Sequence, residues 1–160
     1  MHRYLTKYGV ILPFSMLLII VILFSSGSND KRVKKSDNYV VVVSFDGFRW
    51  DYNRLYDTPN LNRMAEEGVK AERMIPSFPV KTFPNHYSMA TGLYPDHHGI
   101  IHNSFFAPEL GLYYRMKDRS VIENPSLYGG EPVWVTAQKS GIRSAAFYWV
   151  GSEAPVKGMY

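Results

Sequence analysis

Two short segments of the sequence carry residues that could perform phosphoryl chemistry. Asp46 follows an apolar run over residues 39–43, which predicts a buried strand that brings the carboxylate to its C-terminal end. Thr82 stands two residues before Pro84, and proline is favoured in the first turn of a helix. A carboxylate at a strand end and a hydroxyl at a helix N-terminus are what a metal-assisted phosphoryl-transfer site needs. Taken alone, each residue would be explained more simply as a turn or cap residue.

The pattern around these residues predicts an α/β domain with a mostly parallel sheet flanked by helices. Strands are expected at residues 39–45, 69–75 and 142–149, and helices at residues 58–68, 85–91 and 132–140. Residues 94–99 are expected to form a turn and residues 104–130 a surface excursion. Three strands make a thin sheet, so the chain is interpreted as the first portion of a larger domain.

The N-terminus has the features of an export signal. Arg3 and Lys7 precede a mostly apolar segment, and a polar segment rich in Ser follows it. We therefore expect a signal peptide or membrane anchor at residues 1–29, a basic linker at 30–38, and the N-terminal portion of a catalytic domain at 39–160. The expected location is outside the cytoplasm, either periplasmic or extracellular. The chain has no cysteine, which excludes disulfides and thiolate chemistry.

The basic character of the chain is concentrated in this N-terminal region. Residues 1–35 hold six of the 18 Lys and Arg residues and one of the 14 acidic residues. The rest is nearly neutral, so no nucleic-acid groove is indicated, since such a groove needs basic residues spread over the folded surface. The basic segment 31–35 is interpreted as a solvated linker, with contact to anionic lipid as the alternative.

Five segments, taken in order, resemble the nucleotide pyrophosphatase/phosphodiesterase family of the alkaline phosphatase superfamily. Together they extend over most of residues 40–150, and their order makes the resemblance specific. The segments are Ser44-Phe-Asp-Gly-Phe-Arg49, Lys81-Thr-Phe-Pro-Asn-His-Tyr87, Thr91-Gly-Leu-Tyr-Pro95, His98-Gly-Ile-Ile101 with Asn103, and Gly130-Glu-Pro-Val-Trp-Val-Thr136.

This resemblance implies an alkaline-phosphatase-like fold, incomplete in this chain, and a role for each of four residues. Asp46 would be a ligand of one of two zinc ions. Thr82 would be the nucleophile, with its alkoxide on the other zinc, and would form a covalent phospho-threonine intermediate. Asn103 would hydrogen-bond a phosphoryl oxygen, and Phe83 would stack on the nucleobase. A metal-bound alkoxide is consistent with this, because a free threonine hydroxyl is a poor nucleophile.

The family completes its two-zinc site with an Asp-x-x-x-His pair, an Asp-His pair and a final histidine. No histidine follows His102, so these ligands are expected downstream of Tyr160, as is the aromatic residue that faces Phe83. The resemblance puts His86 and His98 in structural segments beside the site, and His97 and His102 are not expected to bind metal.

The sequence supports two hypotheses about function. The first is a zinc-dependent hydrolase of nucleotide phosphodiester or pyrophosphate bonds, and the second is a non-catalytic, membrane-anchored remnant or binding module that lacks the remaining zinc ligands. A sulfatase is disfavoured, because that related family oxidises a Cys or Ser where this chain has Thr82. Phosphomonoesterase, phosphonate hydrolase and lysophospholipase-like specificities stay open.

Overall fold

The computed structural model describes residues 38–160. The predicted signal or anchor at residues 1–29 lies outside the described residues, as does almost all of the linker. Within residues 38–160, no helix is both long enough and apolar enough to cross a membrane.

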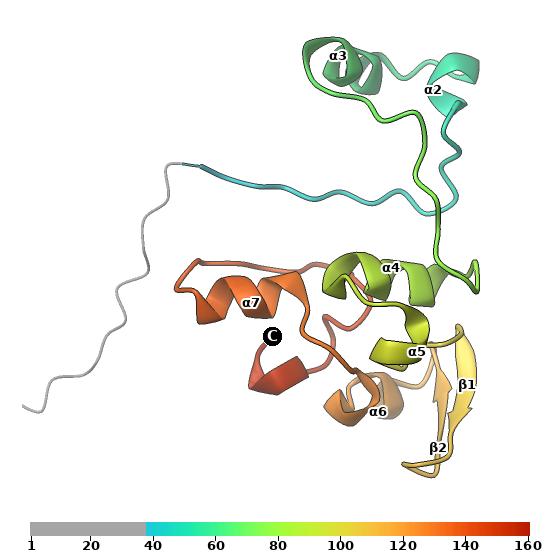
Figure 1. Cartoon of the computed structure of the whole chain (residues 1–160), viewed down its shortest axis with the longest axis vertical. Helices are drawn as coiled ribbons and strands as arrows, with labels where there is room; N and C mark the ends of the chain where they lie inside the picture. The colour runs from blue at the N-terminus through green and yellow to red at the C-terminus, as the bar shows by residue number, and fades with distance from the viewer. Residues whose placement is uncertain (1–37) are drawn as a thin grey trace, which may run out of the picture. The chain divides into compact units, whose positions relative to one another are not determined.

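Short helices joined by loops, together with one small sheet, make up this part of the chain (Figure 1). The helices α2 and α3 precede a long connection to α4, and the remaining elements follow in close succession. In chain order the elements are α2 (Tyr52–Leu55), α3 (Pro59–Glu67), α4 (Thr82–Thr91), α5 (Pro95–His98), β1 (Ser104–Ala107), β2 (Leu112–Arg115), α6 (Arg119–Ile122), the 3-10 turn η1 (Pro125–Leu127), α7 (Val133–Lys139) and the 3-10 turn η2 (Val156–Gly158).

The three predicted helices are present. The helices α3 and α7 lie inside the ranges expected for them, and α3 begins at Pro59 because a proline in the first turn loses no hydrogen bond. The helix α4 begins three residues earlier than expected, at Thr82. Pro84 therefore occupies its first turn, where a missing N–H costs nothing, and Thr82 becomes the first helical residue.

The three predicted strands are not formed in the described residues, and so neither is a mostly parallel sheet. The apolar segment at residues 39–43 remains exposed, with Tyr39 88% and Val43 64% accessible. A strand exists only when its backbone N–H and C=O groups pair with a neighbouring strand. None of the segments 39–45, 69–75 and 142–149 has such a neighbour within residues 38–160.

The sheet that does form is an antiparallel hairpin of β1 and β2, inside the range predicted to be a surface excursion. Phe105 pairs with Tyr114 across the two strands, and their rings stack with centroids 4.9 Å apart. Tyr114 is fully buried, so one face of the hairpin packs on the core. The prediction for this range missed the hairpin, because its aromatic residues are consecutive in the sequence and only their burial alternates along each strand.

Tyrosine rings dominate the core. Tyr87, Tyr114 and Tyr128 pack edge to face, with ring centroids 5.4 Å apart for Tyr87 and Tyr128 and 6.3 Å apart for Tyr114 and Tyr128. Tyr128 donates a hydrogen bond of 2.8 Å to the carbonyl of Ile122. Tyr87 Oη is buried and has no hydrogen-bond partner in the described part of the chain.

Helix α4 lies between two apolar clusters. Tyr87 belongs to the larger cluster, and Ala90, one turn further on, belongs to a smaller cluster with Trp134 and Val135 of α7. The helix therefore contacts both α5 and α7. Burial on two sides fixes the orientation of α4, and with it the position of Thr82.

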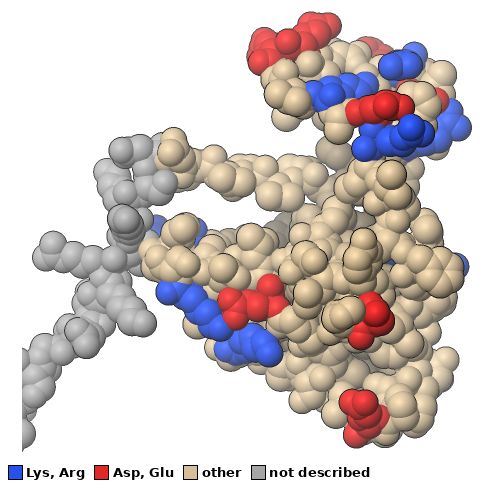
Figure 2. Space-filling model, viewed as in Figure 1, with Lys and Arg blue, Asp and Glu red and all other residues tan. Residues whose placement is uncertain are grey.

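Charged groups lie at the surface of the folded part. Figure 2 shows basic and acidic side chains interspersed among other residues on the face in view. Arg119 and Glu123 form an ion pair of 2.6 Å along α6, and Lys139 pairs with Glu131. Exposed pairs of this kind contribute little to stability because water and salt screen them, so the core and not the surface charge holds the fold.

Alkaline pH should destabilise the protein through the tyrosine core. Burial raises the pKa of Tyr114 to about 12, and burial also raises the pKa values of Tyr87 and Tyr128. In the unfolded chain these phenols ionise near pH ~10, so above that pH the unfolded state binds fewer protons and the free energy of unfolding falls. Urea midpoints measured from about pH 9 to 11 should fall with rising pH, less so in Tyr114→Phe than in the exposed control Tyr113→Phe. Equal slopes in the two variants would contradict this.

Gly151 should not tolerate a side chain. Its φ is +89°, and a Cβ built there would come 2.8 Å from Cε2 of Tyr87. We expect Gly151→Ala to lower the free energy of unfolding by about 2–3 kcal/mol, since backbone strain and overpacking add. Gly141, with φ +74° and nothing within 4 Å of an added Cβ, is the matched control. Gly141→Ala should cost only the strain, about 1 kcal/mol, in the same denaturation experiment.

Candidate functional site

The structure brings Asp46 and Thr82 together at the start of α4. Thr82 Oγ1 donates a hydrogen bond of 3.2 Å to Oδ2 of Asp46. Asp46 lies in a tight turn in which the N–H of Phe48 bonds to the carbonyl of Phe45, and the next residue, Gly47, has a positive φ of 70°. The carboxylate thus lies opposite the helix N-terminus, as the sequence predicts, although the segment before it is not a strand.

Asn103 lies at the same helix end. Its Oδ1 accepts a hydrogen bond of 3.0 Å from the backbone N–H of Phe83. That N–H is one of the amides in the first turn that have no partner inside the helix. Since Oδ1 of Asn103 accepts this bond, its Nδ2 group points elsewhere and has no hydrogen-bond partner within residues 38–160. A hydrogen-bond donor is therefore available beside Thr82.

Phe83 is half-buried. Its ring meets Tyr114 edge-on with centroids 6.1 Å apart, and it packs against the larger core cluster. Part of this side chain therefore contributes to the core, in addition to any contact that it makes with a ligand.

His86, in α4, contacts both the segment that precedes Asp46 and the loop that follows α7. Its Nδ1 lies 2.8 Å from the carbonyl oxygen of Thr82, and its Nε2 lies 3.0 Å from Oγ of Ser44. Trp149 donates a 2.8 Å hydrogen bond from its indole N–H to the carbonyl of His86. The imidazole thus has both nitrogens in contact with protein oxygens, as expected for a residue in a structural segment beside the site.

Asn85 has a role that the sequence analysis did not identify. Its Nδ2 lies 3.1 Å from the carbonyl of Pro79 and 2.9 Å from that of Lys81, while its Oδ1 accepts a 2.8 Å bond from the N–H of Ser77. The loop ahead of Thr82 is therefore held by one side chain. An asparagine just inside a helix that follows a loop is the signal that could have identified it, because asparagine competes for backbone groups.

The described residues supply only part of a metal centre. Asp46 and Thr82 bring two oxygen atoms together, but no group of three or more His, Asp or Glu residues within residues 38–160 could hold a metal ion. His97 pairs instead with Asp96 at 2.9 Å, and His102 bonds to the backbone of Ser104. Zinc centres need three or four protein ligands, so these residues fit a partial zinc site and not a complete one.

Comparison with known proteins identifies the family. Residues 40–159 match the family described as type I phosphodiesterase / nucleotide pyrophosphatase. The chain belongs to this family. It is 42% identical over 142 residues to an uncharacterized pyrophosphatase/phosphodiesterase of Schizosaccharomyces pombe, an alignment that covers 88% of this chain. It is 39% identical over 122 residues, 75% of the chain, to human ectonucleotide pyrophosphatase/phosphodiesterase family member 1.

A solved structure of the same family has a similar fold. Murine ectonucleotide pyrophosphatase/phosphodiesterase 5 aligns with 71% of this chain at a TM-score of 0.66 and 35% sequence identity. The alignment covers 30% of that structure, and this chain spans 29% of the yeast relative and 13% of the human one. The chain therefore corresponds to less than a third of these phosphodiesterase relatives.

The contact between Asn103 and Phe83 can be tested by stability. Asn103→Ala removes the acceptor and leaves the N–H of Phe83 without its partner, so we expect the free energy of unfolding to fall by about 1–2 kcal/mol. Asn103→Asp keeps an oxygen at this position and places a negative charge at a helix N-terminus, which is favourable. Urea denaturation should show Asp at least as stable as the parent. An unchanged free energy of unfolding in Asn103→Ala would contradict a stabilising contact between Asn103 and the N–H of Phe83.

Proposed function

We propose that Thr82 is the nucleophile of a hydrolase that cleaves nucleotide phosphodiester or pyrophosphate bonds. The observation that carries this proposal is the position of the Thr82 hydroxyl at the N-terminus of α4, bonded to Asp46 and beside Nδ2 of Asn103, a donor with no partner within residues 38–160. The two pyrophosphatase/phosphodiesterase relatives, from Schizosaccharomyces pombe and human, support the same class of substrate.

In this mechanism Thr82 Oγ1 attacks phosphorus in line with the leaving oxygen. Oγ1 loses its proton to solvent as the new O–P bond gives a phospho-threonine, and the P–O bond to the leaving group breaks, with solvent supplying a proton to the leaving oxygen. A water molecule then attacks phosphorus, the bond from phosphorus to Oγ1 breaks, and Oγ1 takes up a proton to restore the hydroxyl. The hydrogen bond to Asp46 orients Oγ1. The Nδ2 group of Asn103 donates to a phosphoryl oxygen, where negative charge develops. The partial positive charge at the N-terminus of α4 also stabilises the negative charge on the phosphoryl oxygens.

A two-zinc cofactor is part of this proposal. Asp46 and Thr82 would each contribute an oxygen ligand, and the remaining ligands would come from outside residues 38–160. A metal bound here would favour the alkoxide form of threonine at neutral pH. Phe83 would contact the nucleobase with the part of its ring that the core leaves exposed.

We also infer that the protein acts outside the cytoplasm, in the periplasm or extracellular space, with residues 1–29 as a signal peptide or membrane anchor. This inference rests on the charge and hydropathy pattern of the N-terminus.

A second candidate is a non-catalytic, membrane-anchored remnant or binding module. The incomplete metal-ligand set of residues 38–160 favours it. The two candidates differ in zinc content, because only the hydrolase requires tight binding of two zinc ions.

Substitution of Thr82 distinguishes these candidates. In the intact protein, Thr82→Ala should lower the turnover of bis-p-nitrophenyl phosphate by roughly a thousandfold or more, since it removes the attacking atom. Thr82→Ser keeps a hydroxyl and should retain measurable turnover. Acid quenching with a radiolabelled substrate should trap label on residue 82 in the parent and in the serine variant, and none in the alanine variant. Unchanged turnover in Thr82→Ala would exclude Thr82 as the nucleophile.

A further inference from the structure

A chain of polar groups runs from the buried ring of His98 to the loop in front of Thr82. His98 lies at the end of α5 and is fully buried. Its Nδ1 accepts a 3.1 Å hydrogen bond from the backbone N–H of Ile100, so Nδ1 carries no proton. A neutral imidazole with a bare Nδ1 must have its proton on Nε2. Burial lowers the pKa of His98, which supports the neutral ring.

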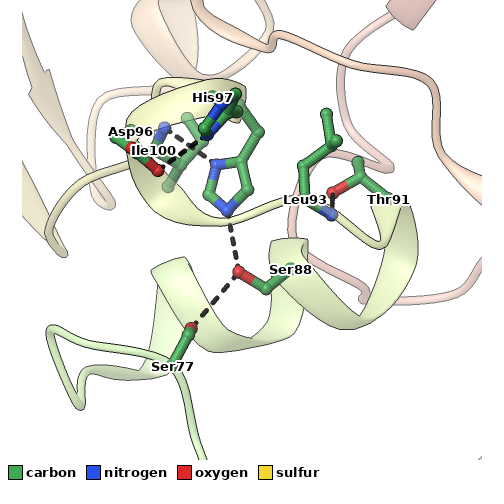
Figure 3. A network of polar contacts seen from close by, with 8 residues as sticks. Ser77, Ser88, Thr91, Leu93, Asp96, His97 and Ile100 are labelled. Carbon is green, nitrogen blue, oxygen red and sulfur yellow. Dashed lines mark hydrogen bonds and ion pairs between the residues drawn. The ribbon is translucent and has the colours of Figure 1, made fainter.

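Each following bond has its direction set by the one before. The Nε2–H of His98 faces Oγ of Ser88 at 3.0 Å, and Ser88 Oγ lies 3.3 Å from Oγ of Ser77 (Figure 3). Because Ser88 accepts from the histidine, its own proton is available to Ser77. Ser77 then donates its proton to Oδ1 of Asn85 over 3.2 Å.

The hydroxyl of Ser77 is one of several groups that together fix which way the Asn85 amide is turned. Oδ1 accepts from both the hydroxyl and the N–H of Ser77, so Nδ2 faces the carbonyls of Pro79 and Lys81. A reversed amide would put its NH₂ group against two donors and its oxygen against carbonyl oxygens. The Lys81 carbonyl belongs to the residue immediately before Thr82, at the N-cap of α4.

We propose that His98, held as the Nε2–H tautomer, is a positioning residue for Thr82 and acts through Ser88, Ser77 and Asn85. The histidine sets the direction of the hydroxyl bonds, the hydroxyl of Ser77 adds a second donor to Oδ1 of Asn85, and the amide holds the loop at residues 77–81. The link to catalysis rests on the proposed function of Thr82, whereas the ordering of the loop does not.

Two substitutions of His98 separate this role from simple core packing. His98→Gln keeps a donor near the position of Nε2, and His98→Asn keeps an acceptor near the position of Nδ1. A purely structural histidine predicts similar losses in both variants. On our proposal, amide hydrogen exchange of Ser77 and Lys81 in the intact protein stays near the parent rate in His98→Gln and rises about tenfold in His98→Asn. Equal exchange rates in these two variants would overturn the proposal.

A milder pair of variants serves if substitutions of His98 impair folding. Ser88→Ala removes the central hydroxyl and leaves a residue that is favourable in a helix. Thr91→Ala is the matched control, because the Thr91 hydroxyl lies on the same helix but bonds to Tyr87 and Leu93, away from the loop (Figure 3). We expect exchange at Ser77 and Lys81 to rise about tenfold in Ser88→Ala and to be unchanged in Thr91→Ala. The same rate in both variants would overturn the proposal.

Steady-state kinetics of the intact protein test whether the order of the loop affects catalysis by Thr82. Ser88→Ala should lower kcat for bis-p-nitrophenyl phosphate about tenfold and leave KM unchanged, because the nucleophile is misplaced while the substrate contacts remain. A change in KM alone, or no change in either constant, would overturn the link to Thr82. If the parent protein shows no turnover, the proposed function fails, and the exchange rates still decide whether His98 orders the loop.

Discussion

The contacts of the Asn85 amide hold the turn on which the candidate site is built. One side chain binds the backbone on both sides of the loop at residues 77–81, and Thr82 follows that loop directly. The first turn of a helix has four N–H groups without internal partners, so it needs side chains to complete it. Asn103 serves one of these groups at Phe83, which brings its amide beside Thr82. The site is therefore a product of the same contacts that begin the helix.

Helix α4 connects the candidate site to the core of the described chain. Its buried face lies between the tyrosine cluster and the cluster around Trp134, and its polar residues reach His98 and Ser44. Apolar burial supplies most of the stability of such a core, while the polar contacts select one orientation of each side chain. The two kinds of contact share the same groups, since the ring of His98 both packs edge-on against Tyr87 and bonds to Ser88.

The family assignment agrees with a site that is only partly built from residues 38–160. A carboxylate, a hydroxyl and an amide meet at one helix end, and the residues that would complete a zinc centre are not among those described. The chain spans less than a third of the relatives compared above, so a partial ligand set agrees with a partial alignment.

The sequence by itself determined the helices α3 and α7 and the family, because capping residues and ordered motifs are local signals. The tertiary structure alone decided the strands. The segment at residues 39–45 has the apolar character of a strand, but pairing requires a neighbour that local sequence cannot supply. The hairpin of β1 and β2 and the link from His98 to Asn85 likewise depend on residues brought together only by folding.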